Sequence, residues 1–308
     1  MEHRALGGSG IEVSALALGS WRTYERMSRE DGIAVMTAAR EAGIDFLDEA
    51  RYDDETGNAP LQTGYSEVVF GELFRASGWV RDDVVVSNKL WWEFWPEQSA
   101  AEELDASLGR MRFDHVDLVY SEQPPDDLPL ADLVAAVTDL VAAGKARAWG
   151  VLNWRAELID EAGRIAAVEG VPAPCAAQLA YSLAVRTAVE NADMGAALES
   201  FGASVVASEV LARGALTGRG RSGRAAEEAE SPRLHRAFEL GNELRYLATE
   251  LETTPVRLAI VLTLANPRVA TALFGASRPE QVRENAGALD LLARMGEREL
   301  TELRAIGA

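Results

Sequence analysis

Short apolar runs alternate with longer segments of helical spacing along almost the whole chain. Each run is rich in valine, leucine, isoleucine and alanine and is interrupted by few polar residues, which is typical of strands buried on both faces of a sheet. The pattern predicts eight strands, at Ala15–Ser20, Asp45–Ala50, Val84–Leu90, His115–Ser121, Ala146–Asn153, Ala176–Tyr181, Ser204–Val210 and Ala270–Ala276.

The segments between these strands place apolar residues three and four positions apart, as amphipathic helices do. Ser28 and Ser99 are expected N-caps, and Gly43 and Gly144 each follow a last helical turn. The clearest predicted helices are Arg29–Ala42, Ala100–Met111, Leu130–Ala143 and Glu157–Val168.

This repeat of strand and helix predicts a parallel sheet covered by helices, and eight is the number of strands that closes into a barrel. We therefore predict an α/β protein with one (β/α)8 TIM barrel domain over residues 1–308 and an N-terminal β-hairpin cap. A doubly wound open sheet is the alternative. It normally carries a glycine-rich phosphate loop after the first strand, and Ala17–Trp21 has no such fingerprint.

Two segments interrupt the alternation. Arg51–Gly64, after the second predicted strand, is a long polar insertion, and Arg213–Arg233, after the seventh, is rich in glycine, arginine and glutamate. Loops at the carboxyl ends of barrel strands build the active site, so both segments are candidate lids.

Composition narrows the classes of partner. The net charge of -19 argues against binding nucleic acid or an anionic membrane, so an anionic ligand needs a dedicated local site. We expect a cytoplasmic protein that acts on a small molecule, since no apolar stretch has the length of a signal peptide or a membrane span. The single cysteine, Cys175, excludes an intrachain disulfide and is expected to be a small buried apolar residue. No spacing of metal ligands is present.

Polar residues end several of the apolar strands. Lys89 is one of only two lysines in a chain whose other basic residues are arginine, and it lies near the end of a buried strand. In a barrel the carboxyl ends of the strands meet at one mouth, so Asp48 and Lys89 are expected to form an ion pair there. A purely structural pair, or a lysine that reaches solvent, is the alternative. The converging residues are Asp48, Lys89, Glu122, Asn153 and Gln178.

Six segments, in order along the chain, resemble motifs of the aldo-keto reductases. They are GIDFLDEA from Gly43, NKLW from Asn88, GVLNW from Gly150, QLAY from Gln178, LARGALTG from Leu211 and GASRPEQVREN from Gly275. The resemblance implies a catalytic group of Asp48, Lys89 and a tyrosine whose pKa the lysine lowers, and hydride transfer from NADPH. It implies cofactor contacts from Gly19, Ser20, Trp21, Asn153, Gln178, Leu211, Gly214, Gly275, Ser277, Arg278, Gln281, Glu284 and Asn285, and substrate contacts from Trp91, Trp92 and Tyr65.

The last of these segments, which begins at Gly275, also predicts a binding site from the chemistry of its residues alone. A hydroxyl, a guanidinium and a helix N-terminus follow one another at Ser277 and Arg278, and together they form an anion site. They suit the 2′-phosphate of NADP, so we expect preference for NADP over NAD. The alternative is that Ser277 only caps the helix and that Arg278 is solvated.

The catalytic tyrosine departs from the family spacing. Five residues beyond Asp48 the chain has Asp53, and Tyr52 comes one position earlier. The insertion that follows could bring the phenol into place, so we predict Tyr52 as the proton donor, with Tyr65 in reserve.

A second departure is Glu122, which stands where the family usually has histidine. An ionised glutamate cannot donate a hydrogen bond to a carbonyl oxygen, so it serves there only if an apolar pocket keeps it protonated. By analogy with the steroid 5β-reductases, which share this replacement, reduction of a conjugated C=C bond is then expected. Otherwise Glu122 pairs with an arginine or Lys89, and the chemistry is lost or changed.

A third departure lies at the seventh strand, where Ser208 replaces the aromatic residue that stacks on the nicotinamide and Glu209 follows it.

We interpret the chain as an NADPH-dependent oxidoreductase that reduces a carbonyl or an enone bound near Trp91–Trp95. The alternative is a nicotinamide-nucleotide-binding barrel with lost or repurposed redox chemistry, as a sensor or a non-redox isomerase or cyclase.

Overall fold

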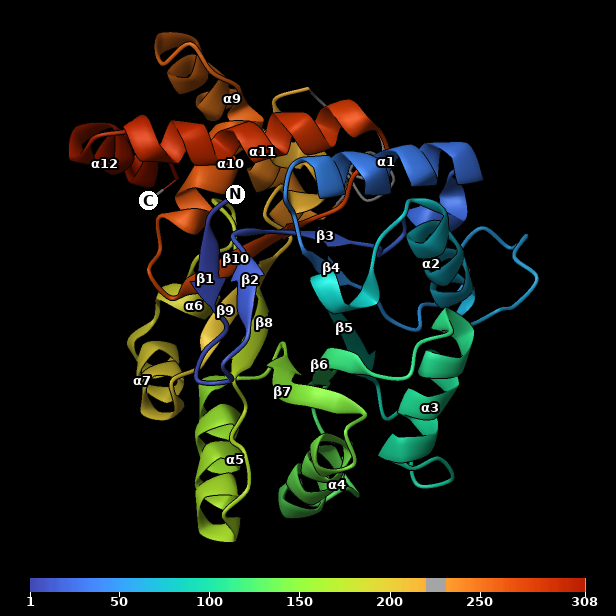
Figure 1. The fold of residues 1–308 in the computed structure, drawn as a ribbon. Helices are drawn as coiled ribbons and strands as arrows, with labels where there is room; N and C mark the ends of the chain where they lie inside the picture. Colours follow the sequence, from blue (N-terminus) through green and yellow to red (C-terminus); the bar gives the residue numbers. More distant parts are fainter. Residues whose placement is uncertain (220–230, 308) are drawn as a thin grey trace.

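A computed structural model describes residues 1–219 and 231–307 of the chain. Within these ranges eight parallel strands close into a barrel, in the order β10-β3-β4-β5-β6-β7-β8-β9 (Figure 1). The predicted fold class is confirmed. The barrel strands are β3 (Leu16–Gly19), β4 (Phe46–Asp48), β5 (Val85–Leu90), β6 (Val116–Ser121), β7 (Ala146–Leu152), β8 (Ala176–Ala180), β9 (Ser204–Ser208) and β10 (Val269–Phe274).

Helices surround the barrel (Figure 1). Their ends carry the expected signals: Ser28 accepts a hydrogen bond from the N–H of Asp31, and Ser99 forms a capping box with Glu102. The helices are α1 (Arg29–Glu41), α2 (Tyr65–Ala76), α3 (Ala100–Met111), α4 (Leu130–Ala142), α5 (Ala156–Glu169), α6 (Thr187–Glu190), α7 (Ala192–Phe201), α9 (Pro232–Glu250), α10 (Pro255–Leu264), α11 (Pro279–Arg294) and α12 (Glu297–Ala305), with 3-10 turns η1 (Tyr24–Arg26), η2 (Arg81–Asp83) and η3 (Ala212–Thr217).

An antiparallel hairpin of β1 (His3–Ala5) and β2 (Glu12–Ser14) covers the amino-terminal end of the barrel. Leu6 and Ile11 of this hairpin belong to the same buried cluster as Cys175 and the inward-facing strand residues. Gly7 lies so close to the strands that a Cβ there would sit 2.1 Å from the carbonyl oxygen of Cys175. The hairpin therefore closes the amino-terminal end of the barrel. Burial there raises the pKa of the Cys175 thiol to about 12, which keeps the thiol protonated and unreactive.

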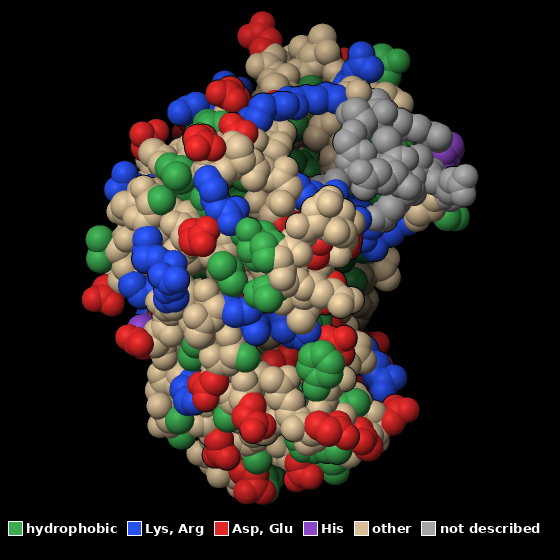
Figure 2. Space-filling model, turned by 90° about the vertical axis from the view of Figure 1, so that its right-hand side faces the viewer, with side chains coloured by type: hydrophobic (Ala, Val, Ile, Leu, Met, Phe, Trp, Pro, Cys, Tyr) green, Lys and Arg blue, Asp and Glu red, His purple; other side chains and the backbone are tan. Residues whose placement is uncertain are grey.

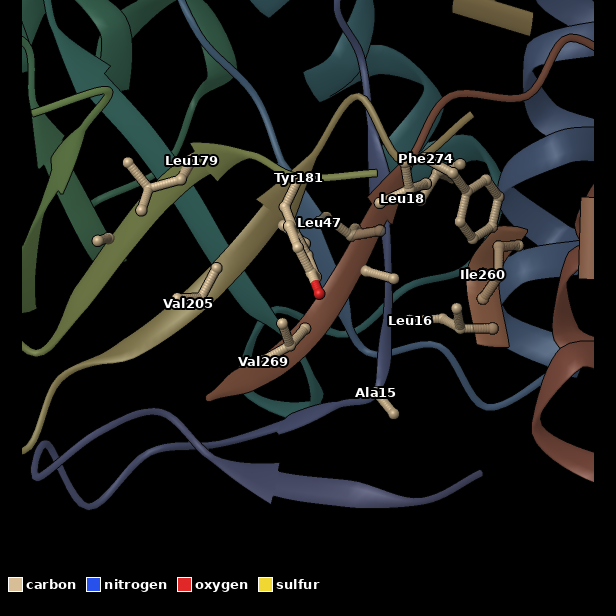
Figure 3. Close-up of a cluster of buried hydrophobic side chains, with 14 of the residues drawn as sticks. Ala15, Leu16, Leu18, Leu47, Leu179, Tyr181, Val205, Ile260, Val269 and Phe274 are labelled. Carbon is tan, nitrogen blue, oxygen red and sulfur yellow. The ribbon is translucent and has the colours of Figure 1, made fainter. Parts of the chain in front are cut away.

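The main hydrophobic core lies between the strands and the helices. Leu16 and Leu18 of β3 and Phe274 of β10 lie beside Ile260 of α10 in this layer (Figure 3). Their packing fixes which face of each strand turns outward, and the alternate residues then face the barrel interior.

This alternation brings the polar strand ends to the mouth. In β4, Phe46 faces the interior and Leu47 the outer core, so Asp48 faces inward. In β5, Leu90 belongs to the outer core, so Lys89 also faces inward. The register pairs Lys89 with Tyr120 of β6. The packing of the outward residues on the strands thus directs the polar side chains of Asp48 and Lys89 toward the same point.

Candidate active site

Asp48 and Lys89 form a buried ion pair at the mouth of the barrel, as the sequence predicts. Nζ of Lys89 lies 2.7 Å from Oδ2 of Asp48, and each residue is 3% exposed. The other carboxylate oxygen, Oδ1, accepts hydrogen bonds from Oγ of Ser87 at 2.6 Å and from Nε2 of Gln178 at 2.9 Å. A charged carboxylate in such a dry place needs these three donors to offset its desolvation.

The hydroxyl of Tyr52 completes the group, because Nζ of Lys89 donates to it at 3.1 Å. The loop after β4 sets this position: the N–H of Gly64 donates to the carbonyl of Tyr52, and Asp53 pairs with Thr63 across the loop. The insertion thus folds back on itself and directs Tyr52 inward, whereas Asp53 is exposed.

Tyr65 lies elsewhere. It begins α2, and its hydroxyl accepts a hydrogen bond from Arg29 of α1 at 3.1 Å. The Tyr65 ring also packs against the same guanidinium: Cζ of Arg29 lies 5.8 Å from the centroid of the ring. The structure therefore brings Tyr52, and not Tyr65, to the lysine.

The protonation of this group differs from the sequence expectation. Burial raises the pKa of the Tyr52 phenol above its ordinary value, and the opposing effect of the Lys89 ammonium does not cancel it. Burial also disfavours the charged form of Lys89, but Asp48 and Tyr52 together outweigh it and raise the pKa of Lys89. At neutral pH the phenol keeps its proton, and the ammonium stays charged beside it.

Glu122 lies half-buried just beyond β6, two residues after Tyr120 and therefore on the same inward face. Its Oε1 accepts a long hydrogen bond, 3.3 Å, from the N–H of Gln123. Within residues 1–219 and 231–307 it forms no ion pair with Lys89 or with any arginine. Burial raises the pKa of its carboxyl above the ordinary value, as a protonated role requires.

Of the aromatic residues after β5, Trp91 faces the site. Its ring centroid lies 6.1 Å from that of Tyr52, at an interplanar angle of 60°. Trp92 instead turns into the outer core, where it is 4% exposed and its Nε1 donates to Ser121 Oγ at 2.9 Å. Trp91 is therefore placed to contact a substrate, and the expected contact from Trp92 does not fit this geometry.

The sequence predicts that two carboxamides hold the nicotinamide. Asn153 is exposed at the mouth after β7, with φ at 55°, and its N–H donates to the carbonyl of Gln178. Gln178 is buried, and its side chain turns toward Asp48. Ser20, at the end of β3, is also buried, and its hydroxyl has no partner within residues 1–219 and 231–307. These groups can hold a nicotinamide carboxamide.

The loop after β9 bends across the mouth. Its first turn holds Arg213 and Gly214 at positive φ, and the Arg213 guanidinium lies 5.0 Å from the centroid of the Trp21 ring, which follows β3. Glu209 forms ion pairs with Arg213, at 3.2 Å, and with Arg233. Glu209 therefore ties together the two ends of the predicted lid, of which residues 220–230 lie outside the described part of the chain. The sequence did not reveal this role, because the second partner, Arg233, lies 24 residues from Glu209 and such a separation leaves no local spacing.

The predicted phosphate site lies at the N-terminus of α11. Oε1 of Gln281 accepts hydrogen bonds from the N–H groups of Ser277 and Arg278, at 2.8 and 3.1 Å. Glu284 pairs with Arg219 of the lid at 2.9 Å. Gln281 and Glu284, both expected to hold adenosine, are thus engaged with the protein. The Arg278 side chain is exposed, so it can reach a phosphate.

Charge around the molecule is uneven. Figure 2 shows Asp and Glu side chains gathered over the lower part of one face, while Lys and Arg lie mainly over its upper part. Four arginines near the mouth pair with glutamates: Arg22 with Glu55, Arg213 and Arg233 with Glu209, and Arg219 with Glu284. Arg278, at the start of α11, is exposed.

Sequence reasoning missed Ser87 and Glu103. Ser87 lies two residues before Lys89 on the same strand, so the period of two along a strand could have placed it beside Asp48. Glu103 lies in a predicted helix whose acidic first turn looked like an ordinary capping feature. Within residues 1–219 and 231–307 no three His, Cys, Asp or Glu side chains could hold a metal ion, and no helix there could cross a membrane.

A closed parallel barrel with a tyrosine, a lysine and an aspartate joined at its mouth defines an NAD(P)-dependent barrel oxidoreductase. The sequence model of the Aldo/keto reductase family matches residues 15–307, and the chain belongs to this family.

Similar proteins cover almost the same length. A protein of Oryza sativa subsp. japonica named as a probable voltage-gated potassium channel subunit beta is 29% identical over 99% of this chain and 96% of its own. A putative voltage-gated potassium channel subunit beta of Schizosaccharomyces pombe is 29% identical over 95% of this chain and 89% of its own. A probable one from Arabidopsis thaliana is 28% identical over 95% and 92%.

Proposed function

We propose that the protein uses NADPH to reduce a small, largely apolar molecule at a carbonyl group or at the C=C bond of an enone. One observation carries this proposal: the hydroxyl of Tyr52 stands 3.1 Å from the Lys89 ammonium, which Asp48 holds at 2.7 Å. In this arrangement the phenol of Tyr52 can donate its proton, and the adjacent Lys89 ammonium stabilises the phenolate that results.

Bound NADPH would supply the hydride. Tyr52 donates its proton to the substrate, and Lys89 donates a hydrogen bond to the phenolate oxygen that forms. Asp48 keeps the ammonium oriented while Ser87 and Gln178 hold Asp48. Trp91 beside Tyr52 supplies an apolar wall that excludes water from the reacting atoms.

Several residues at the mouth suit parts of the nucleotide. The exposed carboxamide of Asn153 and the hydroxyl of Ser20 suit the nicotinamide, and the loop at Leu211 and Gly214 suits a pyrophosphate. Exposed Arg278 at the start of α11 suits the 2′-phosphate, which favours NADPH over NADH. A cytoplasmic location belongs to the same proposal and is supported by the single unpaired thiol of Cys175.

The preference for an enone rests on Glu122. A protonated carboxyl can donate a hydrogen bond to the carbonyl oxygen of an enone, and burial favours that form. We propose to mix the protein with NADPH and a panel of enones and aldehydes, and to follow the absorbance of the reduced nicotinamide. Consumption of NADPH with enones supports the proposal, and saturated carbonyl products would place the chemistry on the C=C bond.

A barrel that binds the nucleotide without using it for reduction is the second candidate. The absence of histidine at position 122 and of an aromatic residue at Ser208 favours it, and the named relatives are potassium channel subunits. The same mixture separates the two functions. NADPH binding, seen by its fluorescence, without consumption across the panel would favour a sensor, isomerase or cyclase.

A further inference from the structure

A buried carboxylate outside the catalytic group anchors the loop that carries Trp91. Glu103 lies in the first turn of α3 and is 4% exposed. Its Oε1 accepts a hydrogen bond from the N–H of Trp91 at 2.9 Å, and its Oε2 accepts one from the N–H of Trp92 at 3.3 Å. Two successive backbone N–H groups directed at one anion form a nest. Glu103 thus fixes the backbone at the point where the strand ends.

The backbone at Trp92 needs such an anchor. Its φ is 59°, in the left-handed region that a bulky L-residue rarely adopts. A conformation of this kind persists only where the surroundings hold it, and it is common where a site must be preorganised. The backbone N–H groups of Trp91 and Trp92 both donate to the carboxylate of Glu103.

Arg51 connects this anchor to the neighbouring loop. Its side chain is 6% exposed, and its Nη2 lies 3.6 Å from Oε1 of Glu103 and 2.8 Å from Oε2 of Glu93. Its Nη1 donates to Oγ1 of Thr63 at 3.0 Å, at the far end of the loop after β4. Arg51 directly precedes Tyr52 in the chain. One guanidinium therefore touches both ends of the loop that carries the proton donor.

We propose that Glu103 and Arg51 form a clasp that positions the proton donor and the aromatic wall relative to each other. Tyr52 must stay 3.1 Å from the Lys89 ammonium while its ring lies 6.1 Å from that of Trp91, and these two aromatic residues come from different loops. The contact between Arg51 and Glu103 is a buried polar link between those loops. An increase in the mobility of one loop should therefore increase the mobility of the other. Glu103 and Arg51 contact no reacting atom and act as positioning residues. The catalytic part of this inference rests on the proposed function.

The clasp is tested on the full-length protein with Arg51→Met, which keeps an unbranched side chain and removes the guanidinium and its charge. Hydrogen–deuterium exchange should become about tenfold faster or more in both segments, 51–64 and 91–99, because both lose their anchor. With a substrate that wild type turns over, kcat should fall about tenfold or more, since displacement of a catalytic group by ~1 Å can cost about 100-fold. NADPH affinity should stay unchanged, and Arg51→Lys should recover part of both effects.

Asp117→Asn is the matched control. Asp117 is 2% exposed, accepts a hydrogen bond from the N–H of Val86 at 2.8 Å, and pairs with Arg81 and Arg147, each at 2.8 Å. It resembles Glu103 in burial and partners but lies near the start of β6, away from the mouth. This variant should lower the unfolding midpoint and leave kcat and the exchange of both loops unchanged.

Faster exchange confined to 51–64 in Arg51→Met would overturn the clasp, because the loops would then move independently. So would an unchanged kcat with both loops loosened. A wild-type protein that consumes no NADPH with any member of the panel contradicts the proposed function instead, and the exchange experiment still decides whether the loops are coupled. Glu103→Gln, which keeps the volume of the side chain, should reproduce the exchange pattern of Arg51→Met.

Discussion

The side chain of Gln178 is hydrogen-bonded to the carboxylate of Asp48: its Nε2 donates to Oδ1 at 2.9 Å. The same residue accepts, through its backbone carbonyl, the N–H of Asn153, whose carboxamide lies at the mouth. One residue thus links the group around Asp48, through its side chain, to the place proposed for the nicotinamide, through its backbone. Binding of the cofactor and orientation of Asp48 are expected to depend on each other through Gln178.

Replacing Gln178 with leucine should therefore affect two steps. We expect weaker NADPH binding and a kcat about tenfold lower, because Asp48 loses one of the groups that hold it. Fluorescence titration of NADPH and steady-state kinetics measure the two effects. Asn153→Ala is the comparison, since it should weaken binding and leave kcat near its wild-type value. Equal behaviour of the two variants would argue against a link through Gln178.

Lys89→Met should abolish turnover and destabilise the fold. The phenol loses the cation that stabilises its anion, which should lower kcat by about 100-fold or more. Asp48 is left as a buried charge without its partner, which costs about 3–5 kcal/mol of unfolding free energy. Urea denaturation measures this loss. The double variant Asp48→Asn with Lys89→Met should recover much of the stability and none of the activity, and an active double variant would refute the role of the pair.

Much of the site could be predicted from local patterns. Apolar runs with period two fix which residues face inward, so Asp48 and Lys89 could be placed together once a parallel barrel was recognised. The family spacing falls on Asp53, and Tyr52 was chosen because the insertion after it could bring its phenol into place. The hydrogen bonds that close this loop, from Gly64 to Tyr52 and across Asp53 and Thr63, had no sequence signal of their own.

The remaining errors share a physical cause. Trp92 lies next to Trp91, and the strand alternation continues past the end of β5, so the two rings turn to opposite sides. Tyr65 begins a helix packed against α1 and is held there by Arg29. In both cases the side chain was assigned by its nearness in sequence to the site, whereas tertiary packing decided its direction.

Glu49 gives a prediction about pH. It is fully buried behind Lys89, and burial raises the pKa of its carboxyl well above the ordinary value. A raised pKa in the folded state stabilises the protein at pH values below the unfolded pKa, and this contribution is lost as pH rises through the folded pKa. Glu49→Gln removes the dependence, so its stability relative to wild type should increase as pH rises above the ordinary pKa of a carboxyl group.

Urea denaturation of both proteins at a series of pH values measures this difference. Glu169→Gln, at the exposed end of α5, is the control and should follow wild type throughout. Parallel stability curves for wild type and Glu49→Gln would mean that Glu49 titrates normally in the folded protein.

Arg278→Leu should reduce the preference for NADPH. The guanidinium is exposed at the start of α11 and is placed to bind a 2′-phosphate that NADH lacks. The ratio of kcat/KM for NADPH to that for NADH should fall about tenfold or more, mainly through the KM of NADPH, as loss of a charge-assisted hydrogen bond predicts. Arg283→Leu, on the same helix, should leave the ratio unchanged. A similar loss with both cofactors would place Arg278 away from the 2′-phosphate.

The proposed role of Glu122 in enone reduction gives a prediction about pH. Burial raises the pKa of its carboxyl, and only the protonated form donates a hydrogen bond to the substrate oxygen. Enone reduction by wild type should therefore decline as pH rises through that pKa. In Glu122→Gln the amide stays neutral and can donate a hydrogen bond at every pH, so the rate of enone reduction should depend less on pH. A wild-type profile that rises with pH would mean that the carboxylate is the active form.

Glu122→His restores the residue usual in the family and tests the same point through the products. A neutral imidazole is a bulkier donor that stands closer to the reacting carbonyl, so the substrate carbonyl carbon, and not the β carbon, should receive the hydride. With one enone as substrate, the product should shift from the saturated ketone toward the allylic alcohol, which chromatography distinguishes. Saturated ketone as the sole product of both proteins would show that the residue at position 122 does not select the bond, and the selection would then rest with the aromatic wall at Trp91.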